Sequence, residues 1–194
     1  METKHATEGA ALVLVDVQND YFAGGRMALP GAERAGKRAA ALLGAWRAAG
    51  LPVVHVRHES VRPGATFFLP GTQGAAIRAE VAPLGDEAVL TKQYPNSFRD
   101  TGLEAALRER GVSRLVVAGM MTNMCIDATV RAAFDLGFEC LAAHDACAAC
   151  ALEFNGLRVG ADQVHAAFLA ALGLVYARLA SVEELVGELD AESR

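Results

Sequence analysis

Residues 114–125, Arg-Leu-Val-Val-Ala-Gly-Met-Met-Thr-Asn-Met-Cys, decide the fold because they join a strand to the start of a helix. The run from Arg114 to Gly119 is almost continuously apolar, which is typical of a parallel strand covered on both faces. The residues from Asn123 to Leu136 have the composition of a helix. A strand that passes into a helix is the repeating unit of an α/β protein, and here it places Cys125 at the carboxyl end of the strand.

The same alternation extends outward along the chain. Apolar runs of strand length alternate with longer stretches of helical period, which indicates a parallel sheet with crossover helices. The other strand candidates are Ala10 to Val17, Pro52 to Arg57, Glu87 to Thr91, Phe138 to Ala142 and Leu174 to Arg178. The other helix candidates are Ala32 to Ala49, Thr101 to Arg110 and Gly160 to Leu172. We therefore predict a single α/β domain over residues 1–194, with a doubly wound, mostly parallel six-stranded sheet flanked by helices.

Several helix boundaries can be predicted from individual residues. Gly50 and Gly111 follow two of the helical stretches, and glycine readily adopts the left-handed conformation that ends a helix. Thr101-x-x-Glu104 and Ser181-x-x-Glu184 have the spacing of a capping box, in which each side chain binds the other residue's backbone N–H. We expect a helix to begin at both of these motifs.

The connection from His58 to Gly85 is long for an α/β unit and contains three of the six prolines. Structureless connections of such length are usually functional. Phe67 and Phe68 form an apolar pair within it. This pair could line a pocket or anchor the connection to the body of the protein, and the sequence leaves both readings open.

The composition is that of a well-packed globular protein, with 53% hydrophobic and 21% charged residues. Much of the apolar surplus is alanine in helical stretches, and some of it could cover a subunit interface. We therefore expect a homo-oligomer, either a dimer or a tetramer.

Charge and hydropathy narrow the range of partners. The formal net charge is -5 and Lys and Arg form no cluster, which argues against a nucleic acid or an anionic membrane surface as a partner. The first ten residues lack the apolar region of a signal peptide, and no stretch approaches the roughly 18 apolar residues of a membrane span. We expect a cytoplasmic protein that acts on a small-molecule substrate.

The four cysteines lie in the second half of the chain, and without a secretion signal we expect free thiols. Three of them and a histidine have spacing that is compatible with zinc ligands: Cys140, His144, Cys147 and Cys150. The alternative is that these cysteines are small apolar fillers after a strand, and we favour it. No metal or other cofactor is predicted.

Three polar residues that follow apolar runs are the candidates for chemistry. Asp16 ends Leu-Val-Leu-Val-Asp, Lys92 follows Ala-Val-Leu-Thr, and Cys125 opens a helix. In an open parallel sheet the carboxyl ends of the strands meet at one edge, so these side chains should face one crevice. Taken alone, Asp16 could be a cap, Lys92 a solvated cation and Cys125 a packing residue. Together they supply the base, the cation and the nucleophile of covalent acyl transfer.

The expected chemistry depends on how the thiol is activated. A free thiol has a pKa near 8.5, and both a helix N-terminus and a nearby ammonium favour the thiolate. Asp16 could accept the proton of Cys125 and later activate water, while Lys92 would keep Asp16 ionised. Backbone N–H groups of the turn from Gly119 to Cys125 could hold the oxyanion.

Three blocks of sequence resemble the isochorismatase-like cysteine hydrolase superfamily, which includes nicotinamidases, N-carbamoylsarcosine amidases, biuret and ureidoacrylate amidohydrolases and streptothricin hydrolases. The blocks are Val-Asp16-Val-Gln18-Asn19-Asp20-Tyr21-Phe22, Lys92-x-x-x-Asn96-Ser97-Phe98-x-x-Thr101-x-Leu103, and Gly119-x-x-Thr122-x-x-Cys125-x-x-x-Thr129-x-Arg131-x-Ala133. The resemblance runs nearly end to end, and the third block is the most specific.

This resemblance implies an Asp-Lys-Cys triad, which falls on Asp16, Lys92 and Cys125. It also implies a cis peptide bond between Met120 and Met121, with the oxyanion bound by the backbone N–H groups of Met121 and Cys125. Further candidates for substrate binding are Tyr21, Phe22, Asn96 and His58. Of these, Tyr21 occupies the position of a pocket aromatic in nicotinamidases.

Two departures from the family pattern concern metal and substrate. Nicotinamidases carry Asp-x-His and further histidines after the second strand, whereas this chain has His55-Val-Arg57-His58. Residues three apart on a strand point to opposite faces, so the two histidines are poor joint ligands, and His58 is left to line the pocket or the long connection. In true isochorismatases, which cleave a vinyl ether, the resemblance implies that the cysteine is replaced. Its presence here favours hydrolysis of an amide, ureide or lactam.

Two alternatives remain open from the sequence. One is a vinyl ether hydrolase of the isochorismatase type, in which Cys125 would be dispensable. The other is a catalytically silent binding protein on the same fold, because a fold does not guarantee a function.

Overall fold

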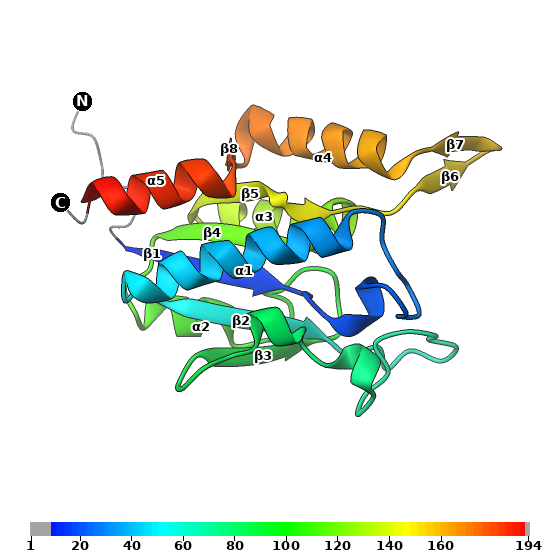
Figure 1. Ribbon diagram of the computed structural model, residues 1–194, viewed down its shortest axis with the longest axis horizontal. Helices are drawn as coiled ribbons and strands as arrows, with labels where there is room; N and C mark the ends of the chain where they lie inside the picture. Colours follow the sequence, from blue (N-terminus) through cyan, green and yellow to red (C-terminus); the bar gives the residue numbers. More distant parts are fainter. Residues whose placement is uncertain (1–8, 193–194) are drawn as a thin grey trace.

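Six strands form one sheet in which all neighbouring strands run parallel (Figure 1). The computed structural model describes residues 9–192. The strands are β1 (Ala10–Val15), β2 (Val53–His58), β3 (Ala88–Lys92), β4 (Arg114–Met120), β5 (Glu139–Ala148) and β8 (Arg178–Ala180). Their order is β3-β2-β1-β4-β5-β8, so the winding reverses between β1 and β4. The predicted doubly wound α/β sheet is confirmed.

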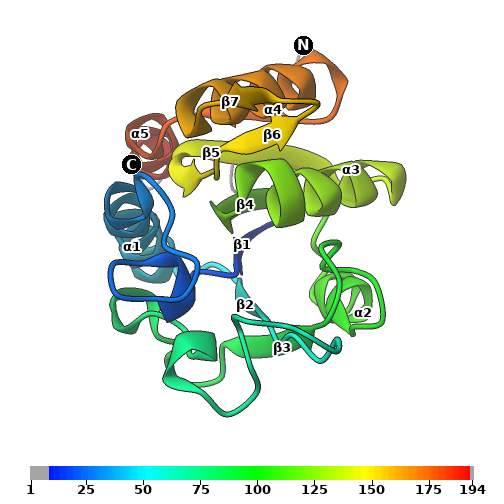
Figure 2. The same cartoon turned by 90° about the vertical axis from the view of Figure 1, so that its right-hand side faces the viewer.

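Helices cover both faces of the sheet (Figure 2). They are α1 (Ala32–Ala48), α2 (Leu103–Arg108), α3 (Asp127–Asp135), α4 (Ala161–Val175) and α5 (Val182–Glu192). Helices α1 and α5 pack on one face and α2 and α3 on the other, while α4 contacts α3 and the edge strand β8. Among the described helices, none combines the length and the apolar character needed to cross a membrane.

The burial of β1 explains its continuous apolar sequence. Leu12 and Leu14 pack in the core on the α1 side, whereas Val13 and Val15 pack in the core on the α3 side. All four side chains are buried. A strand at the centre of a three-layer fold has no solvent face, and this is why it lacks the polar alternation of an exposed sheet.

The last predicted strand exists, but its predicted bounds, Leu174 to Arg178, are wrong. Helix α4 continues to Val175, and the N–H groups of Tyr176 and Ala177 both donate to the carbonyl of Leu172. The strand β8 follows only at Arg178–Ala180. The apolar run predicts a strand from Leu174, but Leu174 and Val175 end the helix and the strand begins only at Arg178.

Strand β5 is longer than the predicted Phe138 to Ala142 and runs to Ala148, with a register shift against β4 between Val117 and Gly119. A small antiparallel hairpin follows it, formed by β6 (Leu152–Phe154) and β7 (Leu157–Val159). The Asn155-Gly156 turn has positive φ at both residues, which is the geometry of a type I′ turn. The Asn-Gly pair is a sequence signal for such a hairpin, which was not predicted.

Only one of the two predicted capping boxes forms. The N–H of Ser181 donates to the carboxylate of Glu184, and the N–H of Glu184 donates to the hydroxyl of Ser181, so this box is confirmed. The box at Thr101 is wrong. There the hydroxyl donates to the Ser97 carbonyl and accepts from the N–H of Leu103, so it holds the preceding turn.

The long connection from His58 to Gly85 is ordered and contains two short 3-10 helices, η2 (Gln73–Ala75) and η3 (Ala79–Val81). Gln18, which is fully buried, donates to the carbonyls of His58 and Ala75 and accepts from the N–H of His58. Asp20 accepts from the N–H of Phe68. Polar residues just after β1 therefore hold the connection against the carboxyl edge of the sheet.

Candidate active site

The structure brings Asp16, Lys92 and Cys125 together. The Nζ of Lys92 lies 2.6 Å from Oδ2 of Asp16 and 3.2 Å from Sγ of Cys125. All three residues are buried, with exposed fractions of 0%, 1% and 6% respectively. An ammonium thus joins a carboxylate and a thiol in a site that water reaches poorly. The three residues lie together, as their positions at the ends of parallel strands predicted.

Each member of this cluster is held by the end of a different strand. Asp16 follows β1 with a φ of 53°, and its N–H donates to the carbonyl of Val56 on β2. A left-handed conformation is uncommon for a residue other than glycine and persists where the surroundings hold it. Lys92 is the last residue of β3, and Cys125 lies in the helical turn η4 (Thr122–Ile126) after β4.

Gly119 permits the close approach of β4 to β1 just below this cluster. Its φ is 131°, and a Cβ at this position would collide with the carbonyl of Val15. Glycine is the residue that meets both demands. The first glycine of the third sequence block is therefore explained by packing between the two central strands.

Burial dominates the electrostatics of the resting site. It raises the pKa of Cys125, Asp16 raises it further, and Lys92 only partly opposes them. Burial likewise raises the pKa of Asp16 against the lowering effect of Lys92. For Lys92 burial acts against the charge, but Asp16 and Cys125 outweigh it and the pKa is raised. Lys92 lowers the pKa of Cys125, as expected, but burial outweighs it, so the thiol of the resting site is protonated. The contribution of the helix start stays a prediction.

Asp16 is placed to receive that proton. Its Oδ2 binds Lys92, whereas its Oδ1 is buried without a hydrogen-bond partner among the described residues. A carboxylate oxygen of Asp16 lies within 4.8 Å of the Cys125 sulfur. An unpaired carboxylate oxygen beside a protonated thiol is the arrangement that a general base needs.

His58 is the fourth polar group of the site. Its Nδ1 lies 3.2 Å from Nζ of Lys92, and burial, followed by the charges of Lys92 and Arg62, lowers its pKa to about 4. The imidazole is therefore neutral at pH 7. Because an ammonium can only donate, Nδ1 must accept and the ring proton lies on Nε2. His55 points to the other face, where its Nε2 lies 2.8 Å from Glu87, so the prediction of opposite faces is confirmed.

The donors of the site also form a potential metal-binding group. Within the described residues, the group of three metal-ligating side chains that lie within 4.8 Å of one another is Asp16, His58 and Cys125. The Nζ of Lys92 contacts all three. Its ammonium already supplies the positive charge that the donors would otherwise bind, so a metal ion fits here only if Lys92 moves away.

The other three cysteines do not belong to this cluster, and all four cysteines are free. Cys140 is buried, and its Sγ lies within 3.8 Å of the carbonyls of Val130 and Phe138. Cys147 is buried within β5. These placements agree with packing roles for the two residues.

The turn before Cys125 has an unusual backbone. The peptide bond between Met120 and Met121 is cis, and the following residues, Thr122–Ile126, form a π-helical turn. The N–H groups of Met124 and Ile126 both donate to the carbonyl of Met121. The start of a helix presents N–H groups without a carbonyl one turn earlier, so this segment can supply oxyanion donors beside Cys125.

Aromatic residues form a wall next to the cluster. Tyr21 packs edge-on against Phe68 at a centroid distance of 4.6 Å, and the ring of His58 lies 5.9 Å from Phe68. Burial raises the pKa of Tyr21, and the next largest contributions come from Cys125 and Asp16, so its hydroxyl lies in their field. Phe68 is buried and Phe67 half-buried. The pair both anchors the connection and borders the site.

Two predicted substrate-binding residues make structural contacts. The guanidinium of Arg78 lies 4.5 Å from the centre of the Phe22 ring, and that ring packs against Gly36 on α1. Asn96 accepts from the N–H of Phe98 within its own turn. A role in substrate binding remains a prediction for both Phe22 and Asn96.

The matched family model, named the isochorismatase domain, covers residues 10–184. The chain belongs to the isochorismatase family. It is 48% identical to an uncharacterized isochorismatase family protein, YddQ, from Bacillus subtilis over 89% of this chain and 96% of that protein. A crystal structure of an isochorismatase hydrolase from Oleispira antarctica matches this family member at 52% identity and a TM-score of 0.89, over 96% of this chain and 99% of the other.

Other relatives of this isochorismatase-family protein carry names that state an activity. A streptothricin hydrolase from Streptomyces noursei is 40% identical over 70% of this chain and 48% of its own length. A maleamate amidohydrolase from Pseudomonas putida is 33% identical over 70% of each chain. The family of this chain is thus one of hydrolases that includes amidases.

Two side-chain contacts around the turn that holds Cys125 were not predicted from the sequence. Asn123 is buried, and its Nδ2 lies 3.7 Å from Sγ of Cys150. Cys150 also contributes to the raised pKa of Tyr21, so it lies near the aromatic wall. The hydroxyl of Thr122 lies 2.9 Å from Nδ1 of His165 on α4. His165 and Cys150 come from distant segments. The motif that contains Cys150 pointed to zinc and not to Asn123, and no motif marks His165.

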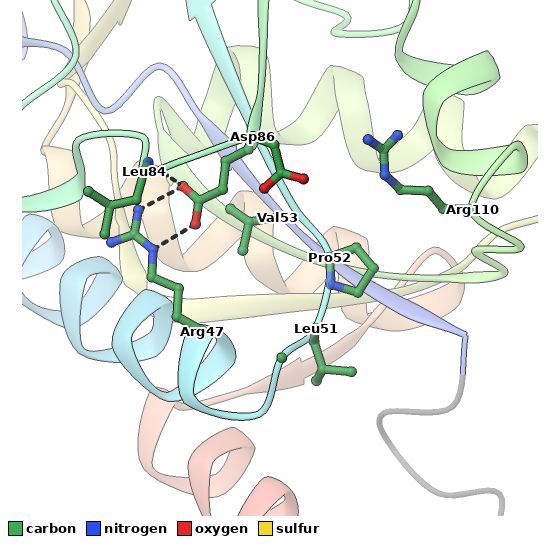
Figure 3. Close-up of a pocket in the computed structure, with 9 residues that line it drawn as sticks. Arg47, Leu51, Pro52, Val53, Leu84, Asp86 and Arg110 are labelled. Carbon is green, nitrogen blue, oxygen red and sulfur yellow. Dashed lines mark hydrogen bonds and ion pairs between the residues drawn. The ribbon is translucent and has the colours of Figure 1, made fainter.

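A separate cavity of about 330 Å³ lies at the opposite, amino-terminal edge of the sheet in this isochorismatase-family protein. Arg47 and Arg110 stand on opposite sides of it (Figure 3). Arg47 is held by two hydrogen bonds to Glu87, which also binds His55 on β2. This ion pair joins α1 to the segment before β3. The cavity is therefore remote from the cluster of Asp16, Lys92 and Cys125.

Proposed function

We propose that this protein is a cysteine hydrolase that cleaves an amide-type C–N bond of a small molecule through a thioester on Cys125. The observation that carries the proposal is the position of the Lys92 ammonium, 2.6 Å from Asp16 and 3.2 Å from Cys125. A buried thiol, a carboxylate base and a fixed cation are the parts that nucleophilic acyl transfer requires.

The first half of the reaction forms the thioester. Asp16 takes the thiol proton as the sulfur of Cys125 attacks the substrate carbonyl, and the carbon–sulfur bond forms. The oxyanion accepts hydrogen bonds from the backbone N–H groups of Met121 and Cys125. When the carbon–nitrogen bond breaks, Asp16 returns its proton to the leaving nitrogen, and ammonia or an amine departs.

The second half releases the acid. Asp16, again a carboxylate, accepts a proton from water as the water oxygen attacks the thioester carbonyl. The carbon–sulfur bond then breaks, and Asp16 gives the proton back to the sulfur of Cys125. Lys92 stays protonated throughout, because its role is to hold Asp16 and to offset the negative charge that passes between the carboxylate and the thiol.

The surroundings favour a small, neutral acyl group. Tyr21 and Phe68 offer aromatic faces, and the Nε2 proton of neutral His58 can donate a hydrogen bond. These features suit a compact amide, ureide or lactam with an acceptor group beside the scissile carbonyl. The names of the streptothricin hydrolase and maleamate amidohydrolase relatives support the amide-type bond and do not bear on the charge or size of the acyl group.

The proposal is tested by measuring ammonia or amine release from a panel of small amides, ureides and lactams, together with mass spectrometry of the quenched enzyme. We expect a mass increase on Cys125 equal to the acyl group. Cys125→Ala should lose turnover, whereas Cys140→Ala, which removes a buried thiol elsewhere, should keep it. Ammonia or amine release that survives Cys125→Ala would show that this thiol is not the nucleophile, whereas cleavage of a vinyl ether by Cys125→Ala would indicate an ether hydrolase of the isochorismatase type instead. A folded protein that neither turns over the panel nor reacts with thiol reagents at Cys125 would refute the mechanism.

A further inference from the structure

Asn123 is a buried amide with an unused acceptor in the turn that holds Cys125. It lies in η4, two residues before Cys125, and is 6% exposed. Its Oδ1 is buried and has no hydrogen-bond partner within residues 9–192, while its Nδ2 lies 3.7 Å from the weakly accepting sulfur of Cys150. A buried amide oxygen without a donor is costly and rare in folded proteins. This oxygen is therefore a candidate contact for a bound ligand.

Asn123 belongs to the part of the turn that a ligand can reach. Met121, Asn123 and Cys125 keep exposed fractions of 7%, 6% and 6%. Of the residues between them, Thr122 is fully buried and Met124 is 44% exposed. In the proposed mechanism the N–H groups of Met121 and Cys125 bind the oxyanion, and Asn123 lies between these two residues in the chain. A substrate held by both donors therefore lies beside Asn123.

The strand order decides which part of a substrate meets Asn123. Strand β4, which leads into the turn, lies between β1 and β5 in the sheet (Figure 2). Asp16 follows β1, whereas Cys150, which Asn123 contacts, follows β5. In the proposed mechanism Asp16 gives its proton to the leaving nitrogen, so the leaving group lies on the β1 side of the turn. The acyl portion of the substrate then extends to the β5 side, where Asn123 lies.

Tyr21 connects the two sides of the turn. Its ring is buried and packs edge-on against Phe68. Burial raises the pKa of its phenol most, and smaller increases come from Cys125, Asp16 and Cys150. Tyr21 is therefore close to the catalytic cluster and also to the cysteine that Asn123 contacts. The aromatic wall thus borders both the thiol and the region beside Asn123.

We propose that Asn123 binds the acyl portion of the substrate and that its Oδ1 accepts a hydrogen bond from an N–H group there. This inference rests on the proposed amide hydrolysis and narrows its substrates to small amides whose acyl portion carries a second N–H, such as N-acylated amino amides. The Oδ1 atom has no partner in the free protein and gains one in the complex. An analogue without the N–H leaves this oxygen buried and unpaired, so the site discriminates against it.

Substrate preference is tested with N-acetylglycinamide and O-acetylglycolamide, two small neutral amides that differ in one N–H of the acyl portion, which is an oxygen in the second compound. We expect kcat/KM for ammonia release by the wild type to be at least about tenfold higher for the first compound. Asn123→Leu should bring the two values close together. Asn123→Asp should keep the preference, because a carboxyl group has an acceptor oxygen in either protonation state. A preference that is absent in the wild type, kept in Asn123→Leu or lost in folded Asn123→Asp would overturn the proposal.

Stability separates recognition from a structural role. Asn123→Leu should not lower the melting temperature of the free protein, because an apolar side chain of similar size replaces a buried amide whose oxygen is unpaired. Asn96→Leu is the matched control, since the side chain of Asn96 accepts from the N–H of Phe98, and it should lower the melting temperature. An equal decrease in the two variants would show that Asn123 supports the fold and would overturn the proposal.

Binding without turnover distinguishes this inference from the proposed reaction. The same two compounds are compared by ligand-observed NMR on Cys125→Ala, which has no thiol to form a thioester. We expect N-acetylglycinamide to bind more tightly than O-acetylglycolamide, and Asn123→Leu added to this variant should remove the difference. That result in a protein whose wild type releases no ammonia from any amide would refute the hydrolysis alone. Equal binding of both compounds, or binding of neither, would overturn the role of Asn123 and leave the hydrolysis to its own test.

Discussion

The hydroxyl oxygen of Thr122 lies 2.9 Å from Nδ1 of His165, which ties the turn before Cys125 to helix α4. Thr122 is fully buried. The pKa of His165 is lowered, chiefly by burial, so that the ring is neutral at pH 7 and Nδ1 can accept the hydrogen bond. We infer that His165 positions the catalytic turn without touching the substrate.

His165→Leu should therefore reduce kcat more than it raises KM, by about tenfold, because the buried Thr122 hydroxyl loses its partner at a cost of roughly 1–3 kcal/mol. His165→Asn keeps an acceptor close to the position of Nδ1 and should restore most of the activity. Steady-state kinetics of both variants on the substrate found in the amide panel checks this. Equal losses in the two variants would point to a packing role only.

The raised pKa of Cys125 predicts slow alkylation at neutral pH. Burial is the main cause, and Asp16 adds to it. In the wild type the rate of reaction with iodoacetamide should keep rising beyond the range in which an ordinary thiol titrates, near pH 8.5. The rate is followed by mass spectrometry of the Cys125 peptide. Saturation of the rate below pH 8 would contradict a protonated resting thiol.

Asp16→Asn should separate thiol reactivity from turnover. It removes the carboxylate that raises the pKa of Cys125 and leaves Lys92, which lowers it, so alkylation at pH 7 should become faster. Hydrolysis should fall by at least about a hundredfold because the base is lost. A thermal melt must first show that the variant is folded. Slower alkylation in a folded variant would show that Asp16 activates the thiol in the resting site.

Lys92→Ala should destabilise the fold by about 3–5 kcal/mol, because Asp16 would be left as a buried charge without its partner. The same change opens the space between Asp16, His58 and Cys125, whose donor atoms are ligands that zinc accepts. We expect Zn²⁺ to raise the melting temperature of this variant but not of the wild type. A Co²⁺–thiolate absorption band would identify Cys125 as a ligand. An equal rise of the melting temperature with Zn²⁺ in the variant and the wild type would contradict metal binding in the space that Lys92 leaves.

Gly119→Ala should be strongly destabilising, by at least about 3 kcal/mol, because the new Cβ would collide with the Val15 carbonyl between the two central strands. Gly44→Ala is the matched control. It lies within α1, where nothing lies within 4 Å of the added carbon, and should stabilise by up to about 1 kcal/mol. Chemical denaturation of both variants measures the difference. A mild effect at Gly119 would mean that β1 and β4 can separate without cost.

His58 should make stability depend on pH. Burial and Lys92 lower its pKa to about 4, whereas an unfolded histidine has a pKa near 6.5. Between these values the unfolded chain binds more protons, so stability falls as the pH decreases from 6.5 to 4. His58→Asn removes this titration and should flatten the melting temperature over that range. An unchanged slope would exclude His58 as the source.

Much of the fold could be predicted because it depends on local pattern. Runs such as Leu12 to Val15 are apolar on both faces, which is what a central parallel strand needs, and Ser181 and Glu184 sit at the spacing of a capping box. The prediction failed where one sequence pattern is compatible with both a helix and a strand. The run from Leu174 is apolar and short, so periodicity could not separate a last helical turn from a strand.

The sequence by itself determined the α/β class and the three catalytic candidates, because Asp16, Lys92 and Cys125 each follow an apolar run and parallel strands end at one edge. Only the tertiary structure decided their protonation, because the pKa of Cys125 depends on burial by residues from many segments. It also decided that the Lys92 ammonium lies among the three possible metal ligands, and that His165 on α4 reaches Thr122. Contacts between distant segments follow from packing, and no local spacing encodes them.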